Sequence, residues 1–228
     1  MSTFLCISDS HGKHNYIPKD WLPKADCIIH SGDVSNIGRE NEVEDFLEWF
    51  SKLPYSHHVF CAGNHDKIFD LQPSIAKEIL AKYHNITYLE DSFVIIDGIK
   101  IYGSPITPSF GYGWAFNKNR GEQIKKHWTA ISDDTSVLIT HGPPYGILDI
   151  VPSGEHAGCQ DLLNRISELK QLKLSIHGHL HGGYGVYKTA TENNLIIANA
   201  SVLNDNYVMT NKPLLFEIKE GKTKNISY

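Results

Sequence analysis

The 228-residue sequence predicts an α/β fold built on one mixed sheet or on two packed sheets. In its first half, short apolar runs alternate with segments whose apolar residues recur at helical spacing. The second half repeats this alternation and then closes with β-rich sequence. No linker rich in Pro, Gly or Ser divides the chain, and its length suits one large domain. We therefore expect residues 1–228 to form a single domain.

Short apolar runs bounded by polar residues mark the expected strands of the first half. The first three runs are TFLCIS, DCIIHS and HHVFCAG, at residues 3–8, 26–31 and 57–63. Residues 40–53 carry apolar side chains at helical spacing after an acidic first turn, and residues 73–84 open with proline. Both features are typical of helices. Residues 86–104 predict three short strands, with Asp97-Gly98 as a hairpin turn.

The second half predicts two further helices and several strands. The expected helices span residues 120–131 and 158–172, and buried strands are expected at 136–140 and 174–178. Three β-rich runs, GVYKT, LIIAN and PLLFEIK, follow them. The longest irregular segment, 104–119, contains four aromatic residues. Such a long loop is either packed on the core or forms a wall that faces a substrate.

Charge and composition exclude several classes of function. The net charge is −5, and the only arginines are Arg39, Arg120 and Arg165. A negative chain with few arginines argues against an extended nucleic-acid surface. A phosphate site in this chain cannot be a cluster of arginine side chains, so it needs metals, Lys, His or backbone N–H groups.

Cysteine usage and hydropathy predict the compartment. The four cysteines form no CxxC pair, and three of them lie in apolar runs, as reduced core thiols do. The N-terminal residues have no basic region typical of a signal peptide, and no apolar run approaches the length of a membrane span. We therefore expect a cytoplasmic protein without a membrane partner.

Polar side chains follow five of the expected strands, at the point where each strand ends. These residues are Asp9, His11, Asp33, Asn64, His141, His179 and His181. A small residue precedes the polar group in each segment, namely Ser8, Gly32, Gly63, Thr140 and Gly178. Small residues let several chain turns converge on one point, and the carboxyl ends of strands are where open α/β sheets bind ligands. We expect these segments to form one site.

The chemistry of this set predicts a metal centre. It offers oxygen and imidazole ligands without thiolates, which suits two divalent transition metal ions such as Mn, with Fe, Zn or Mg as alternatives. Seven ligands are too many for one ion with open positions, so two ions that share one carboxylate are expected. Two metals roughly 3.5–4 Å apart stabilise the attacking and leaving oxygens of a displacement at phosphorus.

Five ordered motifs, DSH, GD, GNHD, THGPP and GHLH, resemble those of the calcineurin-like metallophosphoesterases. Longer stretches such as AGNHDKIFD and GHLHGGYG are similar to the metallophosphoesterase-domain subfamily, which is related to class III cyclic nucleotide phosphodiesterases. The resemblance implies an αββα sandwich of two mixed sheets flanked by helices, with the dimetal site at one edge.

The resemblance also implies a role for each motif residue. One metal would bind Asp9, His11, Asp33 and His181, and the other would bind Asp33, Asn64, His141 and His179. Asp33 would bridge the two ions, and His65 would act as the catalytic, non-ligand histidine beside the scissile phosphate. His30 and His177, which lie inside apolar runs, are expected to be buried in the core or behind the ligands.

One departure from the superfamily pattern narrows the substrate class. Protein Ser/Thr phosphatases of this superfamily carry a GDxVDRG pattern, whereas this sequence reads GDVSNIGR. The difference argues against a phosphoprotein substrate and leaves His65 without the Asp partner of that pattern. The adjacent Asp66 is the candidate to orient His65.

The leading functional hypothesis is a metal-dependent phosphodiesterase for a small substrate, a 2′,3′- or 3′,5′-cyclic nucleotide, cleaved by a metal-bridging hydroxide. A phosphomonoesterase or nuclease with the same site is the alternative, followed by a non-catalytic scaffold. Trp114, Phe116 and Tyr145 are candidates to stack on a nucleobase, Arg120 to contact phosphate, and His156 to reach the site. Trp114 and Phe116 are equally compatible with a place in the core.

Overall fold

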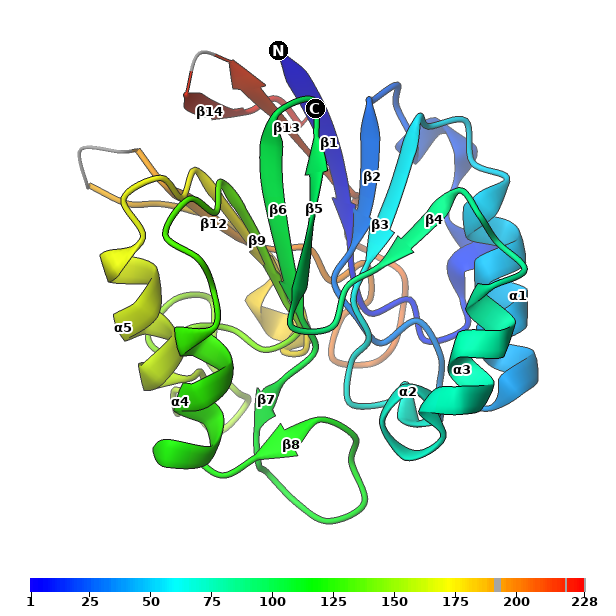
Figure 1. The fold of residues 1–228 in the computed structure, drawn as a ribbon, viewed down its shortest axis with the longest axis horizontal. Helices are drawn as coiled ribbons and strands as arrows, with labels where there is room; N and C mark the ends of the chain where they lie inside the picture. Colours follow the sequence, from blue (N-terminus) through cyan, green and yellow to red (C-terminus); the bar gives the residue numbers. More distant parts are fainter. Residues whose placement is uncertain (191–193, 220, 228) are drawn as a thin grey trace.

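The computed structural model describes residues 1–190, 194–219 and 221–227. Two six-stranded sheets face each other, and helices cover the outer face of each sheet (Figure 1). This arrangement confirms the predicted αββα sandwich.

The first sheet combines a parallel centre with an antiparallel edge. Its strands, in spatial order, are β14 (Lys222–Asn225), β13 (Leu214–Lys219), β1 (Ser2–Ile7), β2 (Cys27–His30), β3 (His57–Phe60) and β4 (Ile86–Tyr88). Strands β1 to β4 are parallel, whereas β13 runs antiparallel to β1 and to β14. The carboxyl ends of β1, β2 and β3 therefore lie at the same edge.

The second sheet has the same plan. Its order is β11 (Gly185–Lys188), β12 (Ile196–Asn199), β10 (Leu174–His177), β9 (Val137–Thr140), β6 (Ile99–Ser104) and β5 (Ser92–Ile96). The middle four strands are parallel, and β11 and β5 are antiparallel edges. The predicted turn Asp97-Gly98 joins β5 to β6, and its two residues have φ values of 50° and 77°. Positive φ at both central residues is the geometry of a type I′ hairpin turn.

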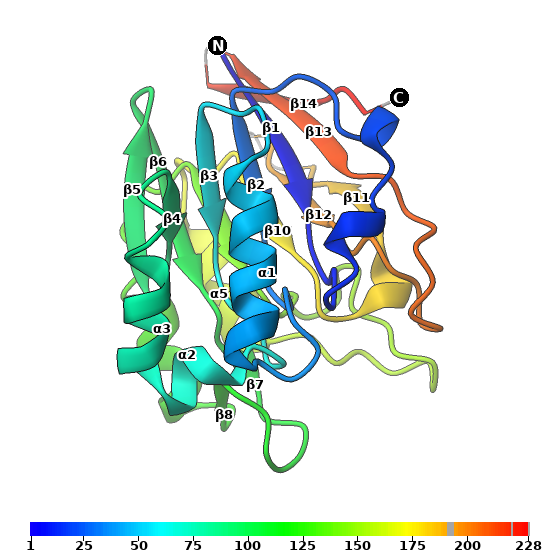
Figure 2. The same cartoon turned by 90° about the vertical axis from the view of Figure 1, so that its right-hand side faces the viewer.

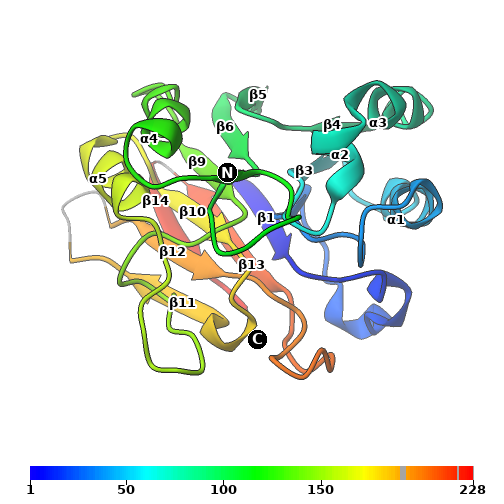
Figure 3. The same ribbon diagram turned by 90° about the horizontal axis from the view of Figure 1, so that it is seen from below.

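The helices cover the outer faces in two groups (Figures 1 and 3). The group on the β1–β4 sheet is α1 (Glu40–Ser51), α2 (Lys67–Leu71) and α3 (Pro73–Leu80), and the group on the other sheet is α4 (Glu122–Thr129) and α5 (Gln160–Glu168). Figure 2 shows α1 lying along its sheet. Short 3-10 helices occur at His14–Tyr16, Lys19–Trp21 and His181–Gly183.

Alternation along the strands divides the core into layers, because successive side chains of a strand point to opposite faces. In β1, Phe4 and Cys6 pack between the two sheets, whereas Leu5 and Ile7 pack with the helices. All four cysteines are buried and free, which confirms the prediction made for the three in apolar runs. Among the described residues, no helix is both long and apolar enough to cross a membrane.

The predicted strands and helices are all present, with ends that differ by up to four residues, but the sequence did not reveal the 3-10 helices, one short α-helix and three strands. Helix α2 has only five residues, too few to show a helical period. Strand β14 reads KTKN and buries only Thr223, so it has no apolar run. Two short strands, β7 (Thr107–Pro108) and β8 (Asn117–Lys118), pair inside the segment predicted to be irregular.

Candidate metal centre

The five predicted site segments meet at one end of the sandwich, where both sheets present the carboxyl ends of parallel strands. The backbone N–H of Asp9 donates to the carbonyl of Gly32 at 3.0 Å, which joins the loops after β1 and β2. The N–H of Gly178 donates to the carbonyl of His141 at 3.0 Å and joins the loops after β9 and β10. A bridge between Ser8 and Ser201 links the first sheet to the second. The structure therefore brings both halves of the chain together at this end.

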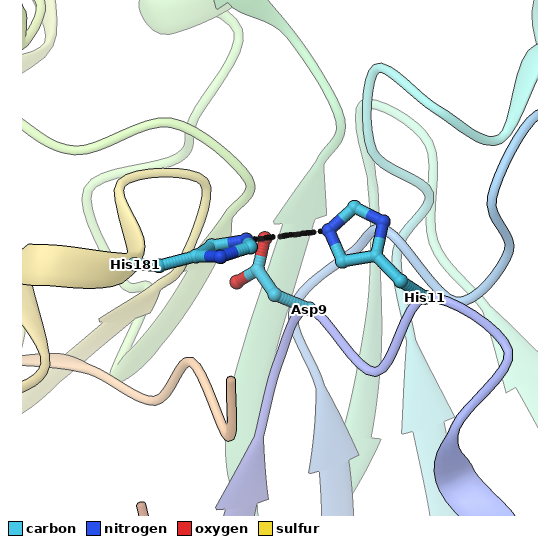
Figure 4. Close-up of side chains that lie close together, drawn as sticks. All are labelled: Asp9, His11 and His181. Carbon is cyan, nitrogen blue, oxygen red and sulfur yellow. Dashed lines mark hydrogen bonds and ion pairs between the residues drawn. The ribbon is translucent and has the colours of Figure 1, made fainter. Parts of the chain in front are cut away.

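The first group of candidate ligands comprises Asp9, His11 and His181, all buried (Figure 4). The His11 and His181 Nε2 atoms lie 3.2 Å apart. Asp9 Oδ1 lies 3.9 Å from the first of these nitrogens and 3.5 Å from the second. Three potential ligand atoms from two segments that are distant in the sequence thus surround one point.

The second group comprises Asp33, His141 and His179, and Asn64 joins it. The His141 Nε2 atom lies 3.3 Å from Asp33 Oδ2 and 3.0 Å from Asn64 Oδ1. Asp33 Oδ2 also lies 3.7 Å from His11 Nε2, in the first group. One carboxylate oxygen therefore stands between the two groups, where a bridging ligand is needed. All seven predicted ligands are brought together.

Backbone carbonyls fix the two imidazoles that have an outer partner. The Nδ1–H of His141 donates to the Ser31 carbonyl at 3.0 Å, and the Nδ1–H of His181 donates to the Asn204 carbonyl at 3.1 Å. Because a carbonyl only accepts, Nδ1 must carry the proton, and in the neutral ring Nε2 is left with a free lone pair. This arrangement is typical of metal-binding histidines. The donor set, which contains only imidazole nitrogen and oxygen, fits divalent transition ions.

The electrostatics favour the ligand-competent protonation states. Burial raises the pKa values of Asp9 and Asp33, but the hydrogen bond and charge of His181 on Asp9, and those of His141 on Asp33, outweigh it and hold both well below the ordinary range. Burial lowers the pKa of His11 to about 4 and that of His179 to about 3. At neutral pH both carboxylates are ionised and both imidazoles are neutral, as metal binding requires.

His141 and His181 differ from the other imidazoles. Burial lowers the pKa of His181, but the hydrogen bond and charge of Asp9 outweigh burial and raise it. The effect on His141 is large. Burial lowers its pKa, but the charge of Asp33 and the hydrogen bond to it outweigh burial and raise the pKa to about 9. Without a cation the proton of His141 compensates the buried Asp33 carboxylate, and this proton must leave when Nε2 binds a metal.

Four of the candidate ligands have a backbone conformation that residues other than glycine rarely adopt. The φ values are 54° for Asp9, 41° for His11, 55° for Asp33 and 67° for His179. Positive φ in a non-glycine residue is uncommon and costs of order 1–3 kcal/mol when the conformation is strained. Such residues cluster at functional sites, where the surrounding structure holds them in place.

The glycines at positions 63 and 178, directly before two ligands, are required because other parts of the site lie very close to their backbone. A Cβ atom on Gly63 would lie 2.2 Å from Asp33 Oδ1, and one on Gly178 would lie 2.0 Å from Asp9 Oδ2. Both distances are far below van der Waals contact. The convergence inferred from small residues in the sequence is therefore a property of the structure.

His65 lies beside the ligands, and its ring is close enough to His11 and Asp33 to form a third candidate group with them. Its ring packs edge-on against His11, with centroids 4.5 Å apart, and its backbone N–H donates to Asp33 Oδ1 at 2.8 Å. The His65 Nδ1–H donates to the Asn36 carbonyl at 2.5 Å. The expectation that Asp66 orients this ring is wrong. The buried Asp66 carboxylate instead accepts from the backbone N–H groups of Val34, Ser35 and Gly63 and from the Ser35 hydroxyl.

A cavity of about 200 Å³ opens over the candidate ligands. Trp114 lines it, together with Phe110 and Tyr207, and its contact with a nucleobase stays a prediction. The Phe110 ring lies 5.0 Å from that of His179, and the Tyr207 ring lies 5.0 Å from those of both His11 and His181. Sequence reasoning missed these two as site residues. Phe110 belongs to the aromatic loop noted above, whereas Tyr207 lies in no motif.

The other predicted substrate residues do not line this cavity. Phe116 is only 2% exposed and packs in the core, so its predicted contact with substrate is wrong and the core alternative holds. The Arg120 guanidinium donates to the carbonyls of Ala157 and Gly158, which occupies the face expected to contact phosphate. Tyr145 and His156 pack against each other, with ring centroids 5.4 Å apart, on the loop that follows β9.

The two histidines assigned to the core are buried as expected. His30 Nδ1 accepts from the Gly32 N–H at 3.3 Å, so its Nε2–H donates to the Ser10 hydroxyl at 3.0 Å. His177 is fully buried within β10. Burial lowers the pKa of both to about 3, so both rings are neutral.

Comparisons with known proteins show which family the chain resembles. Residues 2–183 match the family described as Calcineurin-like phosphoesterase. Metallophosphoesterase domain-containing protein 1 of Homo sapiens and of Mus musculus is 38% identical over 236 residues, which cover 94% of this chain and 70% of the relative.

Two solved structures share the fold at low sequence identity. The protein TT1561 of Thermus thermophilus has a TM-score of 0.69 and 13% identity, over 99% of this chain and 98% of that one. A dimetal phosphatase from Danio rerio has a TM-score of 0.57 and 10% identity, over 100% and 99% of the two chains. The family match over residues 2–183 and the 38% identical relatives show that the chain belongs to the calcineurin-like phosphoesterases.

Proposed function

We propose that this protein is a dimetal-dependent phosphoesterase that hydrolyses phosphodiester bonds, with cyclic nucleotides as the first substrate class to test. The observation that carries the proposal is the pair of buried nitrogen and oxygen ligand groups that meet at Asp33 Oδ2, with His65 beside them. The proposed cofactors are two divalent transition metal ions, with Mn first and Fe, Zn or Mg as alternatives. A phosphomonoesterase or nuclease on the same site is the second candidate.

The candidate ligands divide between two ions. Asp9, His11 and His181 would hold one ion, Asn64, His141 and His179 would hold the other, and Asp33 would serve both. Bound ions of this kind supply Lewis-acid stabilisation of phosphoryl oxygens and an activated water near neutral pH. The protein keeps the ligands preorganised through the strained backbone and the outer carbonyl partners described above.

His65 is placed to act on the leaving oxygen. Its Nδ1–H is held by the Asn36 carbonyl, and its ring lines the cavity. An imidazolium in this position donates from Nε2, either a proton or a hydrogen bond, as charge develops on the leaving oxygen. Asp33 Oδ2 lies 3.9 Å from His65 Nε2, on the side of the ring that faces the candidate ligands.

The cavity and the charge favour a small substrate. A volume of about 200 Å³ admits a phosphate with a small organic group, and Phe110 and Trp114 offer aromatic faces beside it. With a net charge of −5 and three arginines, the chain lacks the basic composition typical of proteins that bind long nucleic acids. A scaffold without activity is disfavoured because all seven ligand positions are present and in contact range.

A substrate panel tests the proposal directly. The protein is loaded with Mn, Fe, Zn or Mg and assayed with 2′,3′- and 3′,5′-cyclic nucleotides, bis-p-nitrophenyl phosphate, p-nitrophenyl phosphate and single-stranded DNA. Metal-dependent turnover of the diesters above that of the monoester supports the proposal. Turnover of the monoester or the DNA alone would favour the second candidate, and no turnover with both metals bound would favour a scaffold.

His65→Ala tests the catalytic assignment. With bis-p-nitrophenyl phosphate as substrate, we expect kcat to fall by about 10²-fold or more, in the range of general acid catalysis. Metal content, measured by elemental analysis, should not change, because His65 is not one of the ligands. His84→Ala serves as control, because His84 is an exposed histidine in the turn between α3 and β4. Turnover similar to that of the unmodified protein would refute the assignment.

A further inference from the structure

A second cavity, of about 220 Å³, adjoins the candidate metal centre. It shares three lining residues with the first cavity, His179, His181 and Tyr207. One further wall comes from residues 150–152, and another from the turn at residues 204–208. That turn lies beyond residues 2–183, the part of the chain that matches the family. The cavity is therefore contiguous with the candidate metal centre, and part of its wall lies outside the residues that match the family.

The 204–208 turn is fixed rigidly against the metal centre. The Asn204 carbonyl accepts from His181 Nδ1–H at 3.1 Å, and Asn204 Oδ1 accepts from the N–H groups of Asn206 and Val208, both at 3.0 Å. The Lys13 ammonium donates to the Tyr207 carbonyl at 2.6 Å. The same turn thus orients a candidate ligand and lines the second cavity, so the wall has a defined position relative to a phosphate bound at the metals.

The chemistry of the lining defines the group it accepts. Ile150, Val151, Pro152 and Leu180 are apolar. Neither Lys nor Arg is among the described residues that line the cavity, and its one carboxylate belongs to Asp205. Asp205 Oδ1 accepts from the Gly182 N–H at 2.9 Å. Because an ionised carboxylate has about four acceptor positions and no donor, the rest of this group is suited to hydroxyl donors and repels a second phosphate.

The volume of the cavity is compatible with a small group. Pockets that enclose drug-sized ligands measure about 300–1,000 Å³, and this cavity measures about 220 Å³, which gives room for a sugar or a glycerol. The apolar residues named above and the Asp205 carboxylate match the carbon skeleton and hydroxyls of such a polyol.

We propose that this second cavity is the subsite for a neutral polyol esterified to the phosphate at the metal centre, with Asp205 as the hydroxyl acceptor. The polyol is a ribose or a glycerol, which share the same chemistry. Asp205 is a specificity-determining residue and not a metal ligand. The inference rests on the proposed function, because it presupposes that phosphate binds at the metals.

Binding of phosphate monoesters tests the subsite without requiring turnover. The dissociation constants of inorganic phosphate, ribose 5-phosphate and glycerol 3-phosphate are measured by calorimetry with the Mn-loaded protein. We expect Asp205→Ala to weaken binding of at least one sugar or glycerol ester about 10- to 100-fold, the range for a hydrogen bond to a charged group, and to leave inorganic phosphate unchanged. The ester that loses affinity identifies ribose or glycerol as the ligand.

Two further variants separate the subsite from general damage. Asp205→Asn keeps an acceptor for the hydroxyl and for the Gly182 N–H, so it should fall between the unmodified protein and Asp205→Ala. Asn206→Ala, in the same turn but not lining the cavity, should bind all three ligands normally. An unchanged ratio of ester to phosphate affinity in Asp205→Ala, or an equal loss for phosphate, would overturn the inference.

Binding by Asp205→Ala and diester hydrolysis by the unmodified protein together distinguish this inference from the proposed function. Selective loss of ester binding in Asp205→Ala, combined with no hydrolysis of any diester by the unmodified protein, would support the subsite and refute the phosphodiesterase. Diester hydrolysis that persists, with an unchanged affinity ratio in Asp205→Ala, would support the phosphodiesterase and refute the subsite.

Discussion

At the scale of single residues, the site is built by backbone conformations and contacts that leave no room for larger side chains. Asp9, His11, Asp33 and His179 all have positive φ, and glycines at positions 63 and 178 let neighbouring loops approach within a distance that a Cβ atom would block. The free energy cost of these conformations is offset by the burial and hydrogen bonding of the surrounding strands. The backbone of the ligands and of the residues next to them therefore fixes the ligand positions.

Gly178→Ala tests this close approach, since its Cβ would lie 2.0 Å from both Asp9 Oδ2 and Ser8 Oγ. We expect a loss of about 1–3 kcal/mol in the free energy of unfolding, as in overpacked cores, together with reduced metal content. Urea denaturation and elemental analysis measure the two effects. Gly111→Ala is the control, because its nearest neighbours are atoms of Trp114 at 3.8 Å, an ordinary contact. Full metal content in Gly178→Ala would show that the loops move apart easily.

At the scale of elements, the ligands lie at the ends of strands, and the helices pack on the sheets that contain these strands. Helix α1 buries Val43, Phe46, Leu47 and Phe50 against the β1–β4 sheet. Its first turn is held by Glu42, whose Oε2 accepts from the Arg39 N–H at 3.0 Å and from the Ile37 N–H at 3.3 Å. The helix thereby anchors the loop that begins with Asp33.

Phe46→Ala should therefore destabilise the whole sandwich. The ring stacks on Phe50 with centroids 5.0 Å apart and contacts His30 and Phe60 at 5.1 and 5.7 Å. Removal of a buried phenylalanine costs about 3–5 kcal/mol of unfolding free energy, measurable by urea denaturation. Glu48→Ala in the same helix removes only an exposed ion pair with Lys52 and should cost less than about 1 kcal/mol. Equal effects of the two substitutions would contradict this account of the core.

At the scale of the whole molecule, two similar sheets pack face to face so that their strand ends form one site. Strands β1, β2 and β3 of the first sheet and β9 and β10 of the second deliver the ligands, and the apolar layer between the sheets keeps the two edges in register. Burial of so many titratable groups in one core makes the stability of the molecule depend on pH.

His30→Asn tests this dependence in the metal-free protein. Burial lowers the pKa of His30 to about 3 in the folded chain, against about 6.5 when unfolded. Below pH 6.5 the unfolded chain binds a proton that the folded chain does not, so stability falls as the pH falls from 6.5 toward 3. At pH 5 this single group accounts for about 2 kcal/mol of lost stability.

The measurement compares urea unfolding at pH 7 and at pH 5. The difference in unfolding free energy between the two pH values should shrink by about 2 kcal/mol in His30→Asn. The exposed His84→Asn serves as control and should leave the difference unchanged. A difference that His30→Asn does not alter would mean that His30 is protonated in the fold.

The sequence by itself predicted the fold class, the main strands and helices, and the seven residues that meet at the strand ends. Hydrophobic periodicity and turn residues are local signals, and the position of a polar residue after an apolar run is local too. Ligand chemistry follows from residue type alone. For these reasons Asp33, His141 and the others were identified although they lie far apart in the chain.

The tertiary structure alone decided what depends on contacts between distant segments. Phe116 is in the core while Phe110 lines the cavity, although both are aromatic residues of one loop. The hydrogen-bond partner of His65 is the backbone carbonyl of Asn36. Every residue has such a carbonyl, so the sequence does not indicate which one accepts. Asp205 and Tyr207 reach the site because the 204–208 turn folds against His181. Periodicity does not encode which side of a loop faces a cavity, because contacts with segments distant in the sequence determine it.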